Sequence, residues 1–145
     1  MPIRTFTSER KEMSKDWVQD MQVMHAKFDV NKAVKNMNAE TLKAFLKFRI
    51  DFLQEELDEM KTSDNADDVV DALIDLCVVA IGTLDLYDVD PYMAWDRVFT
   101  ANIAKEVGVK PERPNPHGLP DLVKPQGWKA PTHEDNVGLL KKAFD

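Results

Sequence analysis

The sequence predicts an all-α protein. Only five of its 145 residues are glycine, few stretches alternate as strands do, and apolar residues recur over long segments with the 3.6-residue period of an α-helix. With 43% hydrophobic and 31% charged residues, the chain has the size and composition of one globular domain around one core. We expect a helical domain in residues 1–109 and a proline-rich C-terminal arm in residues 110–145.

Four helices account for the periodic segments. The first is expected over residues 14–28, with the serine at its start as N-cap. The others are expected over residues 38–61, 66–87 and 91–107, the last with Asp90 as its N-cap. The apolar face of the first helix is formed by Trp17, Met21, Met24 and Phe28. The inward face of the last helix is formed by Trp95, Val98 and Phe99.

The C-terminal arm is rich in proline. Six of the eight prolines lie in KPERPNPHGLPDLVKPQGWKAP, residues 110–131, and this density excludes a regular helix. Leu119, Leu122, Val123 and Trp128 indicate an extended arm packed on the body or on a neighbouring subunit, since disordered segments are poor in such anchors. The last residues, VGLLKKAFD, are expected to contain a short helical turn.

The composition excludes several classes of function. A net charge of -7 and the lack of a basic stripe argue against a nucleic-acid partner. No apolar run reaches the roughly 20 residues of a membrane span, and the start MPIRTFTSERKEM lacks the apolar core of a signal peptide. We therefore expect a cytoplasmic protein with no membrane partner. Cys77, the only cysteine, is expected in the core as a small hydrophobic residue.

Acidic residues lie on the apolar faces of two predicted helices. In FLQEELDEM, Glu56 and Glu59 fall inside the apolar stripe, and Glu55 falls on its border. The third helix is apolar almost all round, so we expect it to be buried, yet Asp71 and Asp75 continue an acidic stripe that begins at residue 68. Ionised carboxylates in a core are costly unless they are paired with bases or hold a metal.

The inward acids outnumber the inward bases, and hard oxygen ligands at this density suit Mg²⁺ or Mn²⁺. The alternative is that the acids face water at an open helix end, or pair with bases across a dimer. A di-iron carboxylate site is disfavoured because it requires Glu-x-x-His motifs, and His25 has Gln22 three residues before it.

Other polar residues are candidates for binding a phosphorylated ligand. Asn102 and Lys105 lie on or beside the inward face of the fourth helix and would suit a phosphate chain, with an ion pair to a third-helix aspartate as the alternative for the lysine. Arg49 lies near the centre of the second helix's apolar stripe. His25 is either a satisfied core histidine or, with Phe28, a contact to a ligand base.

Five segments resemble one protein family. EELDE, residues 55–59, resembles the Glu-Glu-x-x-Glu motif of the MazG-like all-α nucleoside triphosphate pyrophosphohydrolases. The segment VVDALIDLCVVAIGTLDLYDVD is similar to the following helix of the phage and phosphoribosyl-ATP pyrophosphohydrolase-like branch. WDRVFTANIAKEVG, KPQGWKAP and MHAKF resemble its Val-x-x-x-Asn-x-x-Lys, Lys-Pro-x-Gly-Trp and His-x-x-Phe segments. The likeness covers residues 17–131 in the family's order and is nearest to members carried by cyanophages.

The resemblance implies an enzyme that hydrolyses a nucleoside triphosphate between the α and β phosphates, with Mg²⁺ (or Mn²⁺), to the monophosphate and pyrophosphate. It implies a four-helix unit that assembles into a homodimer or homotetramer, acting in the host cytoplasm if the gene is carried by a phage. Two alternatives are a catalytically silent helical sensor that binds a nucleotide or a protein, and a phosphoribosyl-ATP pyrophosphohydrolase.

The resemblance also assigns roles by position. Glu55 or Glu56 would orient or deprotonate the attacking water. The family's second acidic motif is Glu-x-x-Asp, but here Ala72 precedes Asp75 by three residues, so Asp71 or Asp68 completes the set, and we favour Asp71. The implied metal ligands are Glu55, Glu56, Glu59, Asp71 and Asp75. The candidate phosphate contacts are Asn102, Lys105 and Arg49. The candidate base contacts are Trp17, His25 and Phe28.

Overall fold

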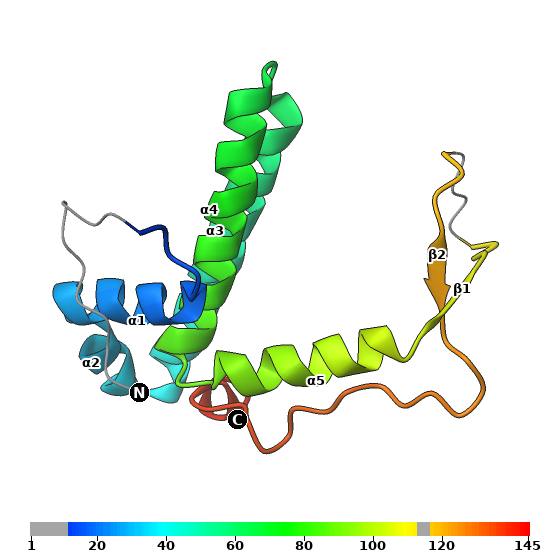
Figure 1. Ribbon diagram of the computed structural model, residues 1–145. Helices are drawn as coiled ribbons and strands as arrows, with labels where there is room; N and C mark the ends of the chain where they lie inside the picture. Colours follow the sequence, from blue (N-terminus) through cyan, green and yellow to red (C-terminus); the bar gives the residue numbers. More distant parts are fainter. Residues whose placement is uncertain (1–11, 113–116) are drawn as a thin grey trace. The chain divides into compact units, whose positions relative to one another are not determined.

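The computed structural model describes residues 12–112 and 117–145. This part of the chain contains six helices and one two-stranded sheet, which confirms the predicted all-α class (Figure 1). The chain divides into two compact units. The helical unit consists of the chain up to Pro91 together with Val137–Asp145, and the arm unit consists of Tyr92–Asn136. The helices are α1 (Trp17–Phe28), α2 (Val30–Lys35), α3 (Ala39–Thr62), α4 (Ala66–Leu86), α5 (Pro91–Ile103) and α6 (Leu140–Ala143).

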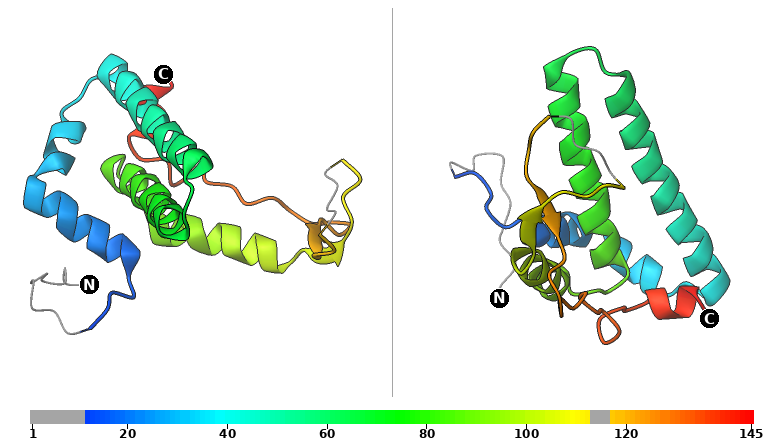
Figure 2. Two further views of the ribbon diagram at one scale, coloured as in Figure 1. Left: turned by 90° about the horizontal axis from the view of Figure 1, so that it is seen from above. Right: turned by 90° about the vertical axis from the view of Figure 1, so that its right-hand side faces the viewer.

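Helices α3 and α4 form a long antiparallel hairpin, seen side by side in Figure 2. Each begins at an asparagine N-cap. Asn38 Oδ1 accepts a hydrogen bond from the Thr41 N–H (2.8 Å), and Asn65 Oδ1 accepts one from the Asp68 N–H (2.8 Å). A cap of this kind stabilises a helix by about 1 kcal/mol. The predicted bounds of both helices are confirmed to within one residue.

Helix α1 begins one turn later than predicted. Its N-cap is Asp16, whose Oδ1 accepts from the Gln19 N–H at 2.9 Å, so the prediction of Ser14 as the cap is wrong. The chain then turns at Asp29, in the left-handed region with φ 54°, and enters α2, which the sequence pattern did not predict. Only Met21 of the predicted apolar face of α1 is buried.

The core lies at the open end of the hairpin, where α3 begins and α4 ends. Leu42 and Tyr87 are fully buried, and the Tyr87 hydroxyl donates to the Leu42 carbonyl at 2.6 Å. The Phe45 and Tyr87 rings stack with centroids 5.9 Å apart. The C-terminus closes this core: the Leu139 N–H donates to the Tyr87 carbonyl (2.7 Å), and Ala143 of α6 is buried. The predicted helical turn in VGLLKKAFD is confirmed.

Helix α4 is less covered than predicted. Its neighbours contact one side, and the other side remains bare, with Val70 61%, Leu73 47% and Ile74 45% exposed. The prediction of a buried helix is therefore wrong for the single chain, because an all-round apolar helix needs neighbours on every side. Cys77 is half-buried and not a core residue. In the described residues, no helix is long and apolar enough to cross a membrane.

The arm unit combines α5 with a short antiparallel sheet of β1 (Glu106–Gly108) and β2 (Asp121–Val123). The predicted extension of this helix to residue 107 is wrong, since the chain enters β1 there. A Cβ at Gly108 would lie 2.8 Å from the Val123 side chain, so glycine permits the close pairing of the strands. Within the arm unit the large apolar residues of the predicted inward face of α5 are exposed, and the burial of this face remains a prediction: Trp95, Val98 and Phe99.

The segment after β2 is held against α5 by side chains. Trp128 Nε1 donates to the Ala101 carbonyl at 2.7 Å. The Arg97 guanidinium donates to both carboxylate oxygens of Asp135, at 2.6 and 2.9 Å, and to the Thr132 carbonyl at 3.1 Å. This ion pair lowers the pKa of the Asp135 carboxyl to about 2. The division of the chain after residue 109 remains a prediction.

Candidate active site

The acidic segment of α3 contains one buried carboxylate, Glu56. This residue is 8% exposed, and its Oε2 atom is buried without a hydrogen-bond partner among the described residues. Burial raises the pKa of the Glu56 carboxyl, and the charges of Glu59, Asp75 and Glu55 raise it further, together with a hydrogen bond to Glu59. Three carboxyl groups from α3 and α4 thus act on Glu56, and we call these four residues the carboxylate cluster.

The cluster is close enough for electrostatic coupling but is not gathered around one point. Among the described residues, no three His, Cys, Asp or Glu side chains already stand in a metal-binding arrangement. Glu55 and Glu59 are exposed, so their side chains are free to turn toward a ligand. Asp71 is not among the groups that raise the pKa of Glu56; it lines, with Glu59 and Asp68, an open cavity of about 350 Å³ beside the turn between α3 and α4.

The carboxylate cluster fits a hard divalent cation. All its donors are carboxylate oxygens, which Mg²⁺ and Mn²⁺ prefer. A buried, unpartnered oxygen such as Glu56 Oε2 is costly in water-poor surroundings and would gain a partner from a cation. The repulsion that raises the pKa of Glu56 would also be relieved by positive charge.

Arg49 of α3 forms hydrogen bonds to two residues of α4. Its Nε donates to Thr83 Oγ1 (2.8 Å), and its Nη2 donates to the Val79 carbonyl (3.0 Å). Burial lowers the pKa of the Arg49 guanidinium. A Cβ at Gly82 would lie 3.0 Å from both Arg49 Nη2 and the Met21 methyl group, so this crossing is closely packed. These contacts occupy donors of Arg49 in the helix pair, and its phosphate contact remains a prediction.

His25 is a satisfied core histidine, one of the two alternatives expected from the sequence, although its partners were not predicted. Its Nδ1 lies 2.5 Å from Asp85 Oδ2, which also accepts from Asn31 Nδ2 at 3.1 Å. Burial alone would raise the pKa of Asp85, but the hydrogen bonds from His25 and Asn31 outweigh it and hold that pKa below its usual value. These partners lie more than 50 residues from Asp85 in the sequence, so no local pattern could reveal them.

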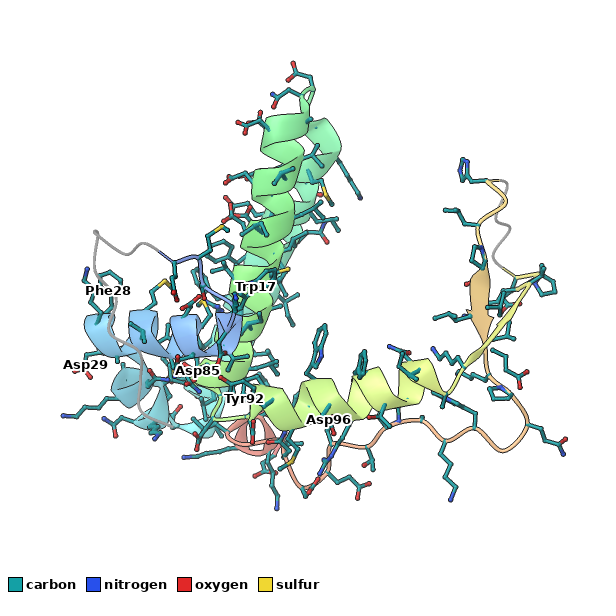
Figure 3. The ribbon with its side chains drawn as sticks, viewed as in Figure 1. Trp17, Phe28, Asp29, Asp85, Tyr92 and Asp96 are labelled. Carbon is teal, nitrogen blue, oxygen red and sulfur yellow. The ribbon has the colours of Figure 1, made fainter. Side chains whose placement is uncertain are left out.

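The three candidate base contacts do not share one cavity. Trp17 and Phe28 stand at opposite ends of α1 and are both largely exposed (Figure 3). Trp17 lines a mainly apolar cavity of about 320 Å³ between α1 and α4, with Asp20 as its acidic residue. His25 is buried against Asp85.

The two remaining candidates belong to the arm unit. Asn102 is exposed near the end of α5. Lys105 is half-buried, and its Nζ lies 5.3 Å from the centre of the Trp128 ring. The contact of Lys105 with Trp128 joins two segments 23 residues apart, so no local pattern in the sequence predicts it.

Comparisons with known proteins identify the family. A family model described as phosphoribosyl-ATP pyrophosphohydrolase matches residues 21–102, more than half of the chain and all of the hairpin that carries the acidic residues. No curated protein and no solved structure matches the chain. The nearer likeness to phage-carried members remains a prediction. The chain belongs to the phosphoribosyl-ATP pyrophosphohydrolase family, within the MazG-like superfamily of pyrophosphohydrolases.

Proposed function

We propose that this protein is a Mg²⁺-dependent nucleoside triphosphate pyrophosphohydrolase that cleaves between the α and β phosphates. The observation that carries the proposal is the carboxylate cluster, with the buried and unpartnered Glu56 oxygen, in the hairpin that the family model matches. Glu55, Glu56, Glu59 and Asp75 would hold Mg²⁺ or Mn²⁺, with Asp71 as a fifth ligand. When bound, the ion would neutralise phosphate charge and lower the pKa of a coordinated water.

Glu56 is the strongest candidate for the general base. Its carboxyl is the buried one of the carboxylate cluster, and the oxygen that does not ligate the ion would accept a proton from the attacking water. In the reaction, water adds its oxygen to one phosphorus, the anhydride P–O bond breaks, and the bridging oxygen leaves with the other phosphoryl group. The water proton passes to the glutamate and from there to solvent.

Substrate contacts complete the proposal. The Asn102 amide and the Lys105 ammonium would donate to phosphate oxygens. The N–H groups of Arg49 that are not bonded to Thr83 or Val79 would donate to the phosphate chain as well. Trp17 offers an exposed ring at the cavity between α1 and α4, where a base could stack. His25 and Phe28, which do not line that cavity, remain candidate base contacts.

Assembly into a homodimer or homotetramer is part of the same proposal. The bare apolar side of α4 supports it, because exposed apolar patches mark interfaces. A cytoplasmic site of action also remains part of the proposal.

A product assay tests this function. The protein is incubated with each of the eight standard NTPs and dNTPs, and separately with phosphoribosyl-ATP, in Mg²⁺ or in EDTA. We expect monophosphate plus pyrophosphate, in Mg²⁺ only. Diphosphate plus phosphate would contradict the proposed cleavage position, and turnover in EDTA would contradict the metal requirement.

The family match itself favours phosphoribosyl-ATP as a second candidate substrate. Turnover confined to that compound would replace free nucleotides as the substrate class. Nucleotide binding with no turnover on any of the nine compounds would identify a catalytically silent sensor instead.

A further inference from the structure

Two ammonium groups lie at one tryptophan ring in the arm unit. Lys105 Nζ is 5.3 Å and Lys124 Nζ is 5.2 Å from the centre of the Trp128 ring. The lysines come from different segments, one just after α5 and the other just after β2. The ring itself is fixed, because its Nε1 donates to the Ala101 carbonyl at 2.7 Å and its backbone N–H donates to the Pro125 carbonyl at 3.0 Å.

Neither ammonium forms an ion pair in the described structure. In the described residues, no carboxylate lies within 4.0 Å of either ammonium, although the whole chain carries a net charge of -7. The two nitrogens can be at most 10.5 Å apart, the sum of their distances to the ring centre. One ammonium would satisfy the ring's attraction for a cation, and a second adds repulsion between like charges. An anion with several negative charges would remove that repulsion.

The chemistry of the group favours an oligophosphate. Ammonium groups bind phosphate as compact point charges, and they reach different oxygens of a phosphate chain. The indole N–H already donates to the Ala101 carbonyl, so the ring offers the two ammonium groups that lie over it, and not a donor for a base.

We propose that Lys105, Lys124 and Trp128 form an oligophosphate-binding site. Lys124 is a second phosphate-binding residue, and Trp128 is a positioning residue that holds both ammonium groups. The identity of the anion, as the phosphate chain of the substrate or the pyrophosphate product, rests on the proposed function. The site itself rests on the contacts within the arm unit.

Inorganic pyrophosphate binding to the full-length chain tests the site. The Trp17→Phe/Trp95→Phe variant leaves Trp128 as the only tryptophan, so its fluorescence reports directly on the ring between the lysines. EDTA in the buffer removes any metal-dependent binding at the carboxylates. We expect a saturable change in emission with pyrophosphate, and roughly tenfold weaker binding of orthophosphate, which spans less of the pair.

Substitutions in the same background separate the two lysines from general charge. Lys105→Gln and Lys124→Gln should each weaken pyrophosphate binding about tenfold, the effect of losing one charge-assisted contact. Lys129→Gln is the matched control, because it removes the same charge from the next residue of the arm and should leave binding unchanged. Equal affinity for pyrophosphate in Lys124→Gln and in the parent would overturn the proposal, as would an equal effect of Lys129→Gln.

The role of Trp128 is tested by calorimetry on otherwise native protein. Trp128→Leu should weaken pyrophosphate binding, and Trp128→Phe should restore most of it, because phenylalanine retains a ring for the ammonium groups. If both variants fold and bind equally weakly, the ring does not position the lysines. Pyrophosphate binding through both lysines without any turnover would leave this site standing and refute the proposed function. Turnover by the wild type, together with unchanged pyrophosphate binding in Lys124→Gln, would refute this site and leave the proposed function standing.

Discussion

Replacing Glu56 with glutamine should abolish activity and stabilise the metal-free protein. The two side chains have nearly the same shape, so the change removes a charge and creates no cavity. The carboxyl is 8% exposed, and one of its oxygens has no partner in the described structure. A neutral amide removes its repulsion with Glu55, Glu59 and Asp75 and supplies N–H donors to the neighbouring carboxylates. Loss of a general base that also binds the metal should reduce turnover by about 10²- to 10⁴-fold.

The pH dependence of this stabilisation has a definite sign. The pKa of Glu56 is raised above its ordinary value of 4.5 in the folded protein. Below pH 4.5 both folded and unfolded chains are protonated, and the group has no effect on stability. As the pH rises from 4.5 to the raised pKa, the unfolded chain releases its proton first, and the wild type loses stability. The variant lacks this loss, so its advantage in the free energy of unfolding should appear above pH 4.5 and persist at pH 7.

Thermal unfolding in EDTA and in Mg²⁺ measures both effects. In EDTA at pH 7 the Glu56→Gln variant should melt above the wild type, and at pH 4 the two should coincide. Added Mg²⁺ should raise the melting temperature of the wild type and have a smaller effect on the variant. Glu40→Gln, an exposed change in the first turn of the same helix, is the control. A fully active variant, or one that melts below the wild type in EDTA, would refute the reasoning.

Three other variants probe the pairs and faces around the site. Asp85→Asn should lower the free energy of unfolding by about 1–2 kcal/mol at pH 7 by weakening the contact with His25. Because the folded pKa of Asp85 lies below 3.8, this difference should disappear as the pH falls through the folded pKa. Chemical denaturation at several pH values measures it. Tyr87→Phe removes the hydrogen bond to Leu42 and should cost about 1 kcal/mol, measured in urea, with kcat unchanged. Leu73→Glu should prevent self-association in size-exclusion chromatography, and an unchanged elution volume would argue against the bare face of α4 as the interface.

The sequence predicted the hairpin well because its signals are local. Asparagine caps and helical periodicity lie within a few residues of the features they determine, and both ends of α3 and α4 follow from them. The end of α5 did not follow, since its helical pattern runs into residues that instead pair with β2 across a loop. The prediction that α4 is buried was wrong for a related reason: an apolar pattern requires a neighbour, and the single chain does not supply one on every side of this helix.

The candidate site was predictable in part. An acid on an apolar stripe is a local anomaly, and of the two acids predicted inside that stripe the structure buries Glu56 and leaves Glu59 exposed. The aspartate of α4 that acts on Glu56 is Asp75, whereas Asp71 lines the cavity nearer the turn. Contacts between distant segments carried no such signal, and the pair of His25 with Asp85 could be found only in three dimensions.

The hairpin separates stability from chemistry along its length. Leu42 in the core and Glu56 in the carboxylate cluster are 14 residues apart on α3, which is about 21 Å along the helix axis. Sites this far apart, with no shared partner, contribute additively to stability. The core can therefore offset the cost of a buried, unpartnered carboxylate without its own packing depending on that carboxylate. This separation explains how acids can occupy the apolar face of a helix whose other end is well packed.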